Sequence, residues 1–245
     1  MEEKLSGIVV SSVSYGESDK ILGVLTLEKG VVSAICKGVK KAGAKLKFAS
    51  EPFCFAEFLF SVRQNRRVVT GASLIDSFYP LRESVNKLYA ASCVLEFAKR
   101  FEKENIVSPG LFLDAVDCLK NLAYKTGGEA AYLVRFYLSA LKKAGFGLEL
   151  NGCFKCGEQI TGRAFFDYRT GGFYSEGCAE SGAREIKFST YDALKNIASG
   201  GVSDDKSAED ALKLIRYFIE NRADENLSAL SQTITVFSRG STLKA

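Results

Sequence analysis

Five short apolar segments follow one another in the first 80 residues, and they constrain the fold more than any other feature of the sequence. Polar turns at Ser14–Asp19 and Glu28–Gly30 separate the first three segments, and none has the length or spacing of an amphipathic helix. Short strands in this arrangement are typical of a small closed barrel such as the OB-fold. The predicted strands are Leu5–Val13, Ile21–Thr26, Val31–Cys36, Phe53–Ser61 and Arg67–Ser77.

After Pro80 the spacing of apolar residues becomes helical. Ser108 is a suitable N-cap and Pro109 a suitable first helical residue, and Gly145 is placed to end a helix. The predicted helices cover residues 84–104, 108–124, 129–144, 190–198 and 208–221, and the last 20 residues have no clear pattern. Residues 151–182 are rich in glycine and cysteine and have little periodicity, which indicates an insert.

We therefore expect an α+β protein. Residues 1–80 are predicted to form an OB-fold domain that binds nucleic acid. Residues 81–245 are predicted to form a helical domain, with a cysteine finger inserted at about 151–182.

The absence of histidine excludes several kinds of site. A Ser-His-Asp triad, a Cys-His pair and a histidine-containing zinc centre cannot be built. The chain also lacks GxxxxGK[ST] and a GxGxxG at a strand–helix junction, so a nucleotide-phosphate site is not expected. No run of about 18 apolar residues occurs, and the N-terminal sequence lacks the apolar core of a secretion signal. We expect a cytoplasmic protein that is not an enzyme and does not cross a membrane.

The most distinctive charge pattern is a lysine loop between the third and fourth predicted strands. Five lysines fall within eleven residues that contain no Asp or Glu: Lys37, Lys40, Lys41, Lys45 and Lys47. Lysine side chains in a glycine-containing loop can follow a phosphate backbone without reading its sequence. Because the net charge is only +4, affinity for a polyanion has to come from such clustering.

A second basic cluster, Arg63, Arg66 and Arg67, lies between the last two predicted strands. If the barrel brings both clusters to one face, they form a cationic groove for nucleic acid. Tyr15, in a turn, is the best candidate for an exposed aromatic that stacks on bases. The alternative is that both loops are solvated segments that keep the protein soluble.

The cysteine finger contains part of a zinc-binding pattern. Cys153 and Cys156 form a CxxC pair followed by glycine, and Cys178 lies where the last ligand of a four-cysteine site is expected. Ser175 occupies the place of the third cysteine, and a neutral serine hydroxyl is a poor zinc ligand. Three cysteines with Ser175, Glu176 or Glu180 could still hold zinc. Alternatively, the finger has lost its metal and folds on its aromatic residues: Phe154, Phe165, Phe166, Phe173 and Tyr174.

These segments resemble the RecO family of bacterial DNA repair proteins. The resemblance is most specific over residues 7–41, in GIVV, YGESDKIL, TLEKG and AICKGVKK. It continues through LKKAGF, the CxxC pair and the F-x-x-x-x-G-G pattern before Cys178, and it covers the chain in the same order. The missing third cysteine is the main departure from the family pattern.

The resemblance implies a mediator of recombinational repair. Such a protein binds single- and double-stranded DNA, anneals complementary strands, and acts with RecR in loading recombinase. It also binds the acidic C-terminal tail of single-stranded DNA-binding protein. By position, the lysine loop and the arginine cluster would contact DNA, and Arg135, Lys142 and Phe146 would contact the tail. Alternatively, Arg135 and Lys142 are ordinary solvated helix charges.

A second functional hypothesis remains open. In it, the protein is an adaptor whose main ligand is the acidic tail, and contact with DNA is incidental.

Overall fold

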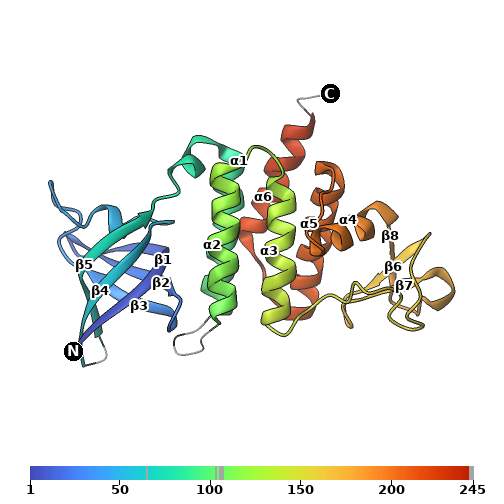
Figure 1. The fold of residues 1–245 in the computed structure, drawn as a ribbon, viewed down its shortest axis with the longest axis horizontal. Coiled ribbons are helices and arrows are strands. Elements are labelled where there is room, and N and C mark those ends of the chain that lie inside the picture. The colour runs from blue at the N-terminus through green and yellow to red at the C-terminus, as the bar shows by residue number, and fades with distance from the viewer. Residues whose placement is uncertain (65, 103, 105–107, 243–245) are drawn as a thin grey trace. The chain divides into compact units, whose positions relative to one another are not determined.

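The computed structural model describes residues 1–245 except 65, 103, 105–107 and 243–245 (Figure 1). The chain divides into two compact units. The first unit comprises Met1–Glu83 and Val94–Ala123, and the second comprises Ser84–Cys93 and Tyr124–Ala245. The division falls within helix α1 (Val85–Phe101), which contributes to both units.

Five strands of the first unit form a closed barrel in the order β1-β2-β3-β5-β4. Neighbouring strands are antiparallel except β3 and β5, which are parallel. This order confirms the predicted OB-like barrel. The strands are β1 (Glu2–Tyr15), β2 (Asp19–Thr26), β3 (Gly30–Cys36), β4 (Phe55–Arg63) and β5 (Arg66–Asp76).

The barrel interior is filled by alternate residues of each strand. Phe58 and Phe60 of β4 are fully buried, and their rings stack with centroids 5.8 Å apart. Burying a side chain of this size contributes roughly 1.5–3 kcal/mol. The backbones also approach closely, because a Cβ at Gly7 would lie 2.5 Å from a methyl carbon of Val24. The alternation of apolar and polar residues along each strand therefore determines which side chains form the core.

A helix covers part of the outside of this barrel. Phe55 alternates with the inward residues of β4 and pairs with Ile8 of β1. Its ring meets that of Phe112 in α2 (Pro109–Tyr124) edge-on, at 5.8 Å. Helix α2 begins at Pro109, as predicted, and Ser108 accepts the backbone N–H of Leu111 through its carbonyl oxygen.

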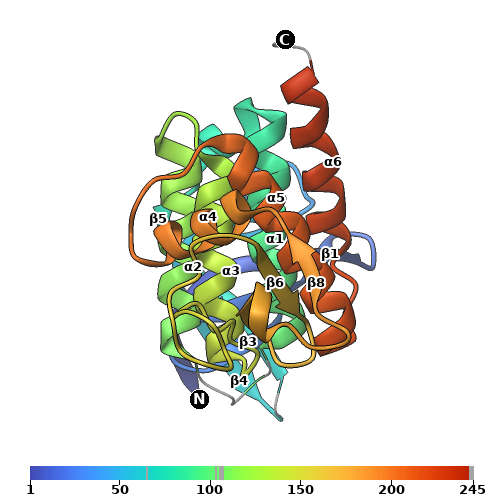
Figure 2. The same cartoon turned by 90° about the vertical axis from the view of Figure 1, so that its right-hand side faces the viewer.

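The second unit combines four further helices with a small sheet (Figure 2). Helix α5 packs against α3, α4 and α6. The elements are α3 (Glu129–Lys143), α4 (Phe188–Ala198), α5 (Asp205–Phe218) and α6 (Ser228–Thr242), with strands β6 (Ala164–Asp167), β7 (Gly172–Ser175) and β8 (Arg184–Ile186). The short helical turns of the chain are η1 (Phe48–Ser50), η2 (Tyr79–Glu83), η3 (Glu176–Cys178) and η4 (Ile219–Ala223).

Helix α3 ends at the predicted glycine. Gly145 has φ +85°, and the following N–H of Phe146 donates to the carbonyl of Leu141 at 2.8 Å. A left-handed glycine with this bond is a common helix ending. Helix α5 starts earlier than predicted, because Asp204 caps it by accepting the N–H of Ser207 at 2.9 Å. This bond lowers the pKa of the Asp204 carboxyl.

The finger is a three-stranded sheet that packs on the helices, with strand order β7-β6-β8. Phe166 of β6 meets Phe218 of α5 at 5.9 Å, and Phe173 of β7 meets Tyr191 of α4 at 5.1 Å. The sequence pattern gave no indication of these strands or of α6. None of the described helices is both long enough and apolar enough to cross a membrane.

Candidate nucleic-acid interface and cysteine cluster

The lysine loop (residues 37–47) is a chain of tight turns between β3 and η1. Lys41 N–H donates to the Gly38 carbonyl at 3.1 Å, Ala44 to Lys41 at 3.2 Å, and Lys47 to Ala44 at 3.2 Å. Gly38 and Gly43 have φ of +66° and +73°, which glycine adopts without strain. All five lysine side chains are exposed. The loop therefore presents its charges from a backbone with internal hydrogen bonds.

The lysine loop is fastened to the turn between β1 and β2. Lys40 N–H donates to the Ser18 carbonyl at 3.0 Å, and Gly38 N–H donates to the Asp19 carboxylate at 2.8 Å. The Gly38 bond, a bond from the Ser18 hydroxyl and the charges of Lys37 and Lys41 lower the pKa of Asp19. Asp19 therefore offsets part of the positive charge. None of the five lysines forms an ion pair within the described structure.

Two exposed aromatic side chains lie at the same end of the barrel. Tyr15 is 54% exposed at the end of β1, beside Asp19 of β2. Phe48 is 37% exposed at the start of η1, directly after the lysine loop. Proteins that bind single-stranded nucleic acids commonly combine cationic loops, which contact phosphates, with aromatic rings, which stack on bases.

Strand pairing gives the positions of the two basic clusters on the barrel, and a groove shared by both stays a prediction. The β4–β5 hairpin carries Arg63 and Arg66 and follows Ser61, which pairs with Glu2 at the start of β1 (Figure 1). The lysine loop instead lies beside the end of β1. Across the barrel, however, Arg67 of β5 pairs with Ala34 of β3, and Lys37 follows Ala34 by three residues, about 10 Å of strand. The clusters therefore lie near opposite ends of β1 but are neighbours across the β3–β5 pair.

Arg67 differs from its two neighbours because it is only 7% exposed. Its Nε lies 2.9 Å from Glu3 Oε2, and its Nη1 lies 2.7 Å from Glu104 Oε1. Lys29 also donates to Glu3, and this bond, together with Arg67, lowers the pKa of Glu3 despite its burial. Arg67 is thus held by two carboxylates, so we assign it a structural role. Arg63 and Arg66 remain exposed.

Arg135 and Lys142 lie seven residues apart on α3, which places them two turns apart on one face. Arg135 is half-buried, and its Nη2 donates to the Gly201 carbonyl at 3.4 Å. Its buried Nε has no hydrogen-bond partner in the described structure. Lys142 is exposed, and Phe146 is half-buried just beyond the end of the helix.

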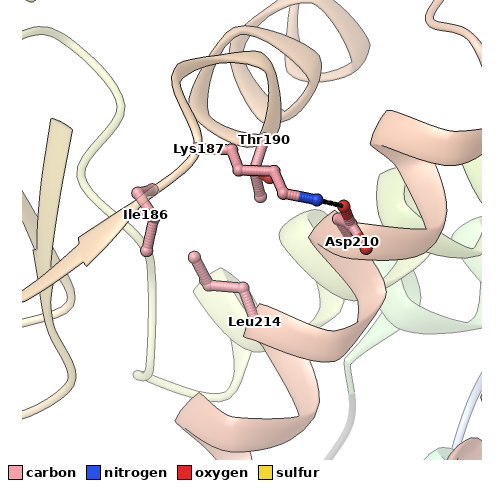
Figure 3. A pocket seen from close by; sticks show the side chains of 5 residues that line it. All are labelled: Ile186, Lys187, Thr190, Asp210 and Leu214. Atoms are coloured by element: carbon pink, nitrogen blue, oxygen red, sulfur yellow. Dashed lines mark hydrogen bonds and ion pairs between the residues drawn. The ribbon is translucent and has the colours of Figure 1, made fainter. Parts of the chain in front are cut away.

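A shallow pocket of about 220 Å³, open to solvent, lies between β8, α4 and α5 (Figure 3). Ile186 and Leu214 form its apolar wall. On the polar side, Lys187 Nζ forms an ion pair with Asp210 Oδ2 at 2.9 Å. Asp210 also pairs with lysines of α5, which lowers its pKa even though burial opposes this. The sequence analysis did not single out this pocket, because its residues come from three elements.

The structure brings three cysteines of the finger together. The Sγ atoms of Cys153, Cys156 and Cys178 lie within 4.8 Å of one another. The backbone around Cys153 folds into a tight knuckle, in which Cys153 N–H donates to Glu158 O and Gly157 N–H donates to Cys153 O, both at 2.8 Å. A Cβ at Gly152 would lie 2.7 Å from Glu158 O, so the knuckle requires glycine there.

Ser175 lies next to this cluster and donates to it. Its backbone N–H is 3.5 Å and its hydroxyl 3.6 Å from Cys153 Sγ. Burial opposes ionisation of Cys153, but N–H groups of Cys156, Ser175 and Lys155 outweigh it and lower the pKa of this thiol to about 6. The backbone N–H of Glu158 favours the thiolate of Cys156. Hydrogen bonds of Cys156 with the sulfurs of Cys153 and Cys178 outweigh this and raise the pKa of Cys156.

The remaining four cysteines are buried thiols outside any disulfide, as expected from their apolar contexts: Cys36, Cys54, Cys93 and Cys118. Burial raises the pKa of Cys36 and of Cys54 to about 11.

Comparison with known proteins identifies the same family along almost the whole chain. Residues 1–78 match the model described as "Recombination protein O N terminal", and residues 82–231 match "Recombination protein O C terminal". Similar curated proteins are named DNA repair protein RecO. The protein of Acetivibrio thermocellus is 26% identical over 239 residues, 93% of this chain and 94% of that protein. The protein of Anaeromyxobacter sp. (strain K) is 29% identical over 238 residues, 92% of this chain and 93% of that protein.

Proposed function

The chain belongs to the RecO family of DNA repair proteins, and from this premise we propose that it is a DNA-binding and strand-annealing mediator of recombination. It binds single- and double-stranded DNA and anneals complementary strands. It acts with RecR in loading recombinase, in the cytoplasm, where its DNA substrate lies. The observation that carries the proposal is the lysine loop, whose five exposed ammonium groups lie at one end of an OB-like barrel.

The lysine loop is the primary DNA contact in this proposal. Its lysines are free of ion pairs in the described structure, so binding to DNA does not require them to leave a carboxylate. Its folded backbone limits the conformational entropy that is lost on binding. Tyr15 and Phe48 supply faces on which bases can stack.

Arg63 and Arg66 form a separate, secondary contact. OB-folds bind oligonucleotides over the face of strands 2 and 3, between the loop that joins strands 1 and 2 and the loop that joins strands 4 and 5. In this barrel, the lysine loop is fastened to the first of these loops, and Arg63 and Arg66 flank the second. A sufficiently long strand therefore contacts the lysine loop first and reaches the arginines across the barrel.

Annealing by this surface needs no catalytic group. Two DNA strands repel each other through their phosphates, and lysines that neutralise phosphates on both strands reduce this repulsion. Base pairing then supplies the driving force. We accordingly propose that the protein is not an enzyme and hydrolyses no nucleotide.

A second surface is proposed for the acidic tail of single-stranded DNA-binding protein. Arg135 and Lys142 share one face of α3, and the buried Nε of Arg135 lacks a partner in the described structure. An acidic peptide would give this group an acceptor, and Phe146 would contact an apolar residue of the peptide. Under the adaptor hypothesis this surface is the main one.

We also propose that the cysteine cluster holds zinc. Three thiol groups within 4.8 Å of one another fit a thiolate-bound zinc ion, which stabilises a small sheet such as the finger by crosslinking its loops. Cys153, Cys156 and Cys178 would be the ligands.

Titration of labelled single-stranded DNA tests the main proposal. The intact chain is compared with the variant in which Lys40, Lys41 and Lys45 are replaced by alanine. We expect weaker binding by the variant for every DNA sequence, and slower annealing in proportion. Equal affinities would remove the lysine loop from the interface.

A further inference from the structure

We propose that the cysteine cluster is an open metal site: three thiolates hold zinc, and the fourth coordination position is occupied by solvent and exchangeable for a small thiolate. This inference rests on the zinc binding proposed above and adds the identity of the fourth ligand. It also assigns Ser175 a role as a hydrogen-bond donor to the site and not as a ligand.

Three positions of a tetrahedral site are accounted for by the cysteines. Zinc–sulfur bonds of about 2.3 Å place the sulfurs of a tetrahedral site roughly 3.8 Å apart. The three Sγ atoms already lie within 4.8 Å of one another, so closing on a metal requires shifts of about 1 Å or less.

The fourth position has no strong protein ligand among the described residues. Glu176 is paired with Arg163, and Glu180 with Lys155 at 3.1 Å. Neither carboxylate belongs to the group of metal-ligating atoms around the sulfurs. Histidine is absent from the chain altogether. The metal therefore has to complete its coordination from outside the protein.

Ser175 is oriented as a donor to the sulfur of Cys153. Both its N–H and its hydroxyl point toward Cys153 Sγ, at 3.5 and 3.6 Å. Such hydrogen bonds stabilise a thiolate ligand and fix its orientation. A neutral hydroxyl that already donates to a thiolate has little tendency to displace water from zinc.

The cluster is accessible from one side. Cys153 is 3% exposed, whereas Cys156 is exposed and Cys178 is half-buried. Solvent and small molecules therefore approach from the side of Cys156. Lys155 lies within the same knuckle and forms an ion pair with Glu180 at 3.1 Å.

The exchange is a ligand substitution without oxidation or reduction. The sulfur of the incoming thiolate donates its electron pair to the metal, the metal–water bond breaks, and the water leaves. The proton of the incoming thiol goes to the buffer. The number of thiolates on the metal rises from three to four.

Cobalt(II) provides a visible readout, because its absorption reports how many thiolates bind it. The full-length protein, kept reduced with a phosphine, is loaded with Co²⁺ and then titrated with 2-mercaptoethanol. We expect a three-thiolate spectrum that shifts toward a four-thiolate spectrum as the thiol is added. The variant Ser175→Cys should show the four-thiolate spectrum from the start and should not respond to added thiol.

The variant Ser175→Ala tests the assigned role of the serine. We expect its spectrum to keep the wild-type shape, with metal affinity reduced by about tenfold through loss of the hydrogen bond. A change in its spectrum would make Ser175 a ligand and would overturn the proposal. A wild-type spectrum that ignores 2-mercaptoethanol would overturn it too.

The outcomes separate this inference from the zinc proposal. If the wild-type protein binds neither Co²⁺ nor Zn²⁺, both fail. If it binds metal with a spectrum that does not respond to thiol, only the open position fails. DNA binding is measured separately and depends on neither result.

Discussion

Arg67 Nε and Glu3 Oε2 lie 2.9 Å apart, although 64 positions separate the two residues in the chain. Both side chains are less than 9% exposed, so the pair is buried at the end of the barrel where β1 begins. The arginine that the sequence grouped with two DNA-binding candidates thus belongs to the framework of the barrel.

Replacing Arg67 with alanine should destabilise the protein. Glu3 and Glu104 would lose a shared partner, and breaking a buried ion pair costs about 3–5 kcal/mol. Urea unfolding at neutral pH measures the loss. Arg66→Ala is the matched control, because Arg66 is exposed, and its effect should stay within about 0.5 kcal/mol. If Arg67→Ala unfolds at the same urea concentration as wild type but binds DNA more weakly, Arg67 contacts DNA and its structural role is refuted.

The stability contributed by Glu3 should depend on pH. Its pKa in the folded state lies below the ordinary glutamate value of 4.5, so its contribution is present above pH 4.5 and is lost as the pH falls through the lowered value. The variant Glu3→Gln cannot titrate at this position. The difference in unfolding free energy between wild type and variant should therefore shrink as the pH is lowered below 4.5. A difference that stays constant down to pH 3 would contradict the pairing.

The lysine loop should determine the salt dependence of DNA binding. Each phosphate contact on single strands contributes about −0.7 to the slope of log K against log salt concentration. Removing Lys40, Lys41 and Lys45 together should therefore reduce the slope by about 2. The control variant replaces Lys4, Lys120 and Lys206, which are exposed and dispersed, with the same change in net charge. Equal slopes for the two variants would indicate that only the total charge matters.

The Arg63 and Arg66 pair should matter only for longer strands. OB-folds occupy about 4–16 nucleotides, and the two basic clusters lie near opposite ends of β1. The double variant Arg63→Ala, Arg66→Ala should bind an oligonucleotide of about 5 nucleotides as wild type does, and one of about 20 nucleotides more weakly. Fluorescence anisotropy with both lengths measures this. Equal losses at both lengths would place the arginines at the primary contact.

The two functional hypotheses differ in which surface is needed for function: the lysine loop under the DNA-binding hypothesis, and the Arg135–Lys142 face under the adaptor hypothesis. A fluorescent acidic peptide that ends in an apolar residue should bind the lysine-loop variant as well as wild type. Arg135→Ala and Lys142→Ala should weaken peptide binding while leaving DNA affinity intact. If the peptide does not bind the wild-type chain, the adaptor hypothesis fails. If instead strand annealing depends on the peptide surface alone, the adaptor hypothesis is preferred.

The barrel strands were predictable because alternation and glycine turns are local signals. All five predicted strands are present, but β1 runs from Glu2 to Tyr15, beyond the predicted Leu5–Val13. Its polar ends are strand because they pair with β4 and β2, which are distant in sequence. Pairing of this kind extends a strand past its apolar segment.

The contacts that decide the role of each arginine were not predictable. Charge clustering in the sequence indicates which cations are neighbours along the chain, but it does not show which acids fold against them. Arg67 meets Glu3 only because β4 pairs with both β1 and β5. The position of Arg67 opposite Ala34, three residues before the lysine loop, likewise follows from strand register.

The finger was only partly predictable. The spacing of Cys153, Cys156 and Cys178 indicated their convergence, and their sulfurs do lie together. The strands β6 to β8 are three or four residues long and are stabilised by aromatic contacts with α4 and α5, such as Phe173 with Tyr191. Helix α6 similarly packs through residues such as Leu230 and Phe237, which are buried only in the folded unit.

Closure of the barrel has a consequence for how other molecules can attach. Each of its five strands has a neighbour on both sides, which limits the unpaired edges open to strand addition or aggregation; the shortest pairing is between β3 and β5, with the pairs Ala34–Arg67 and Ile35–Val68. In the finger, Phe154 N–H bonds to Phe173 on the outer edge of β7, and Glu149 N–H bonds to Gly171 just before it, whereas β8 pairs with β6 alone among the described strands. β8 is three residues long and carries Arg184 and Glu185, features that protect an unpaired edge from self-association.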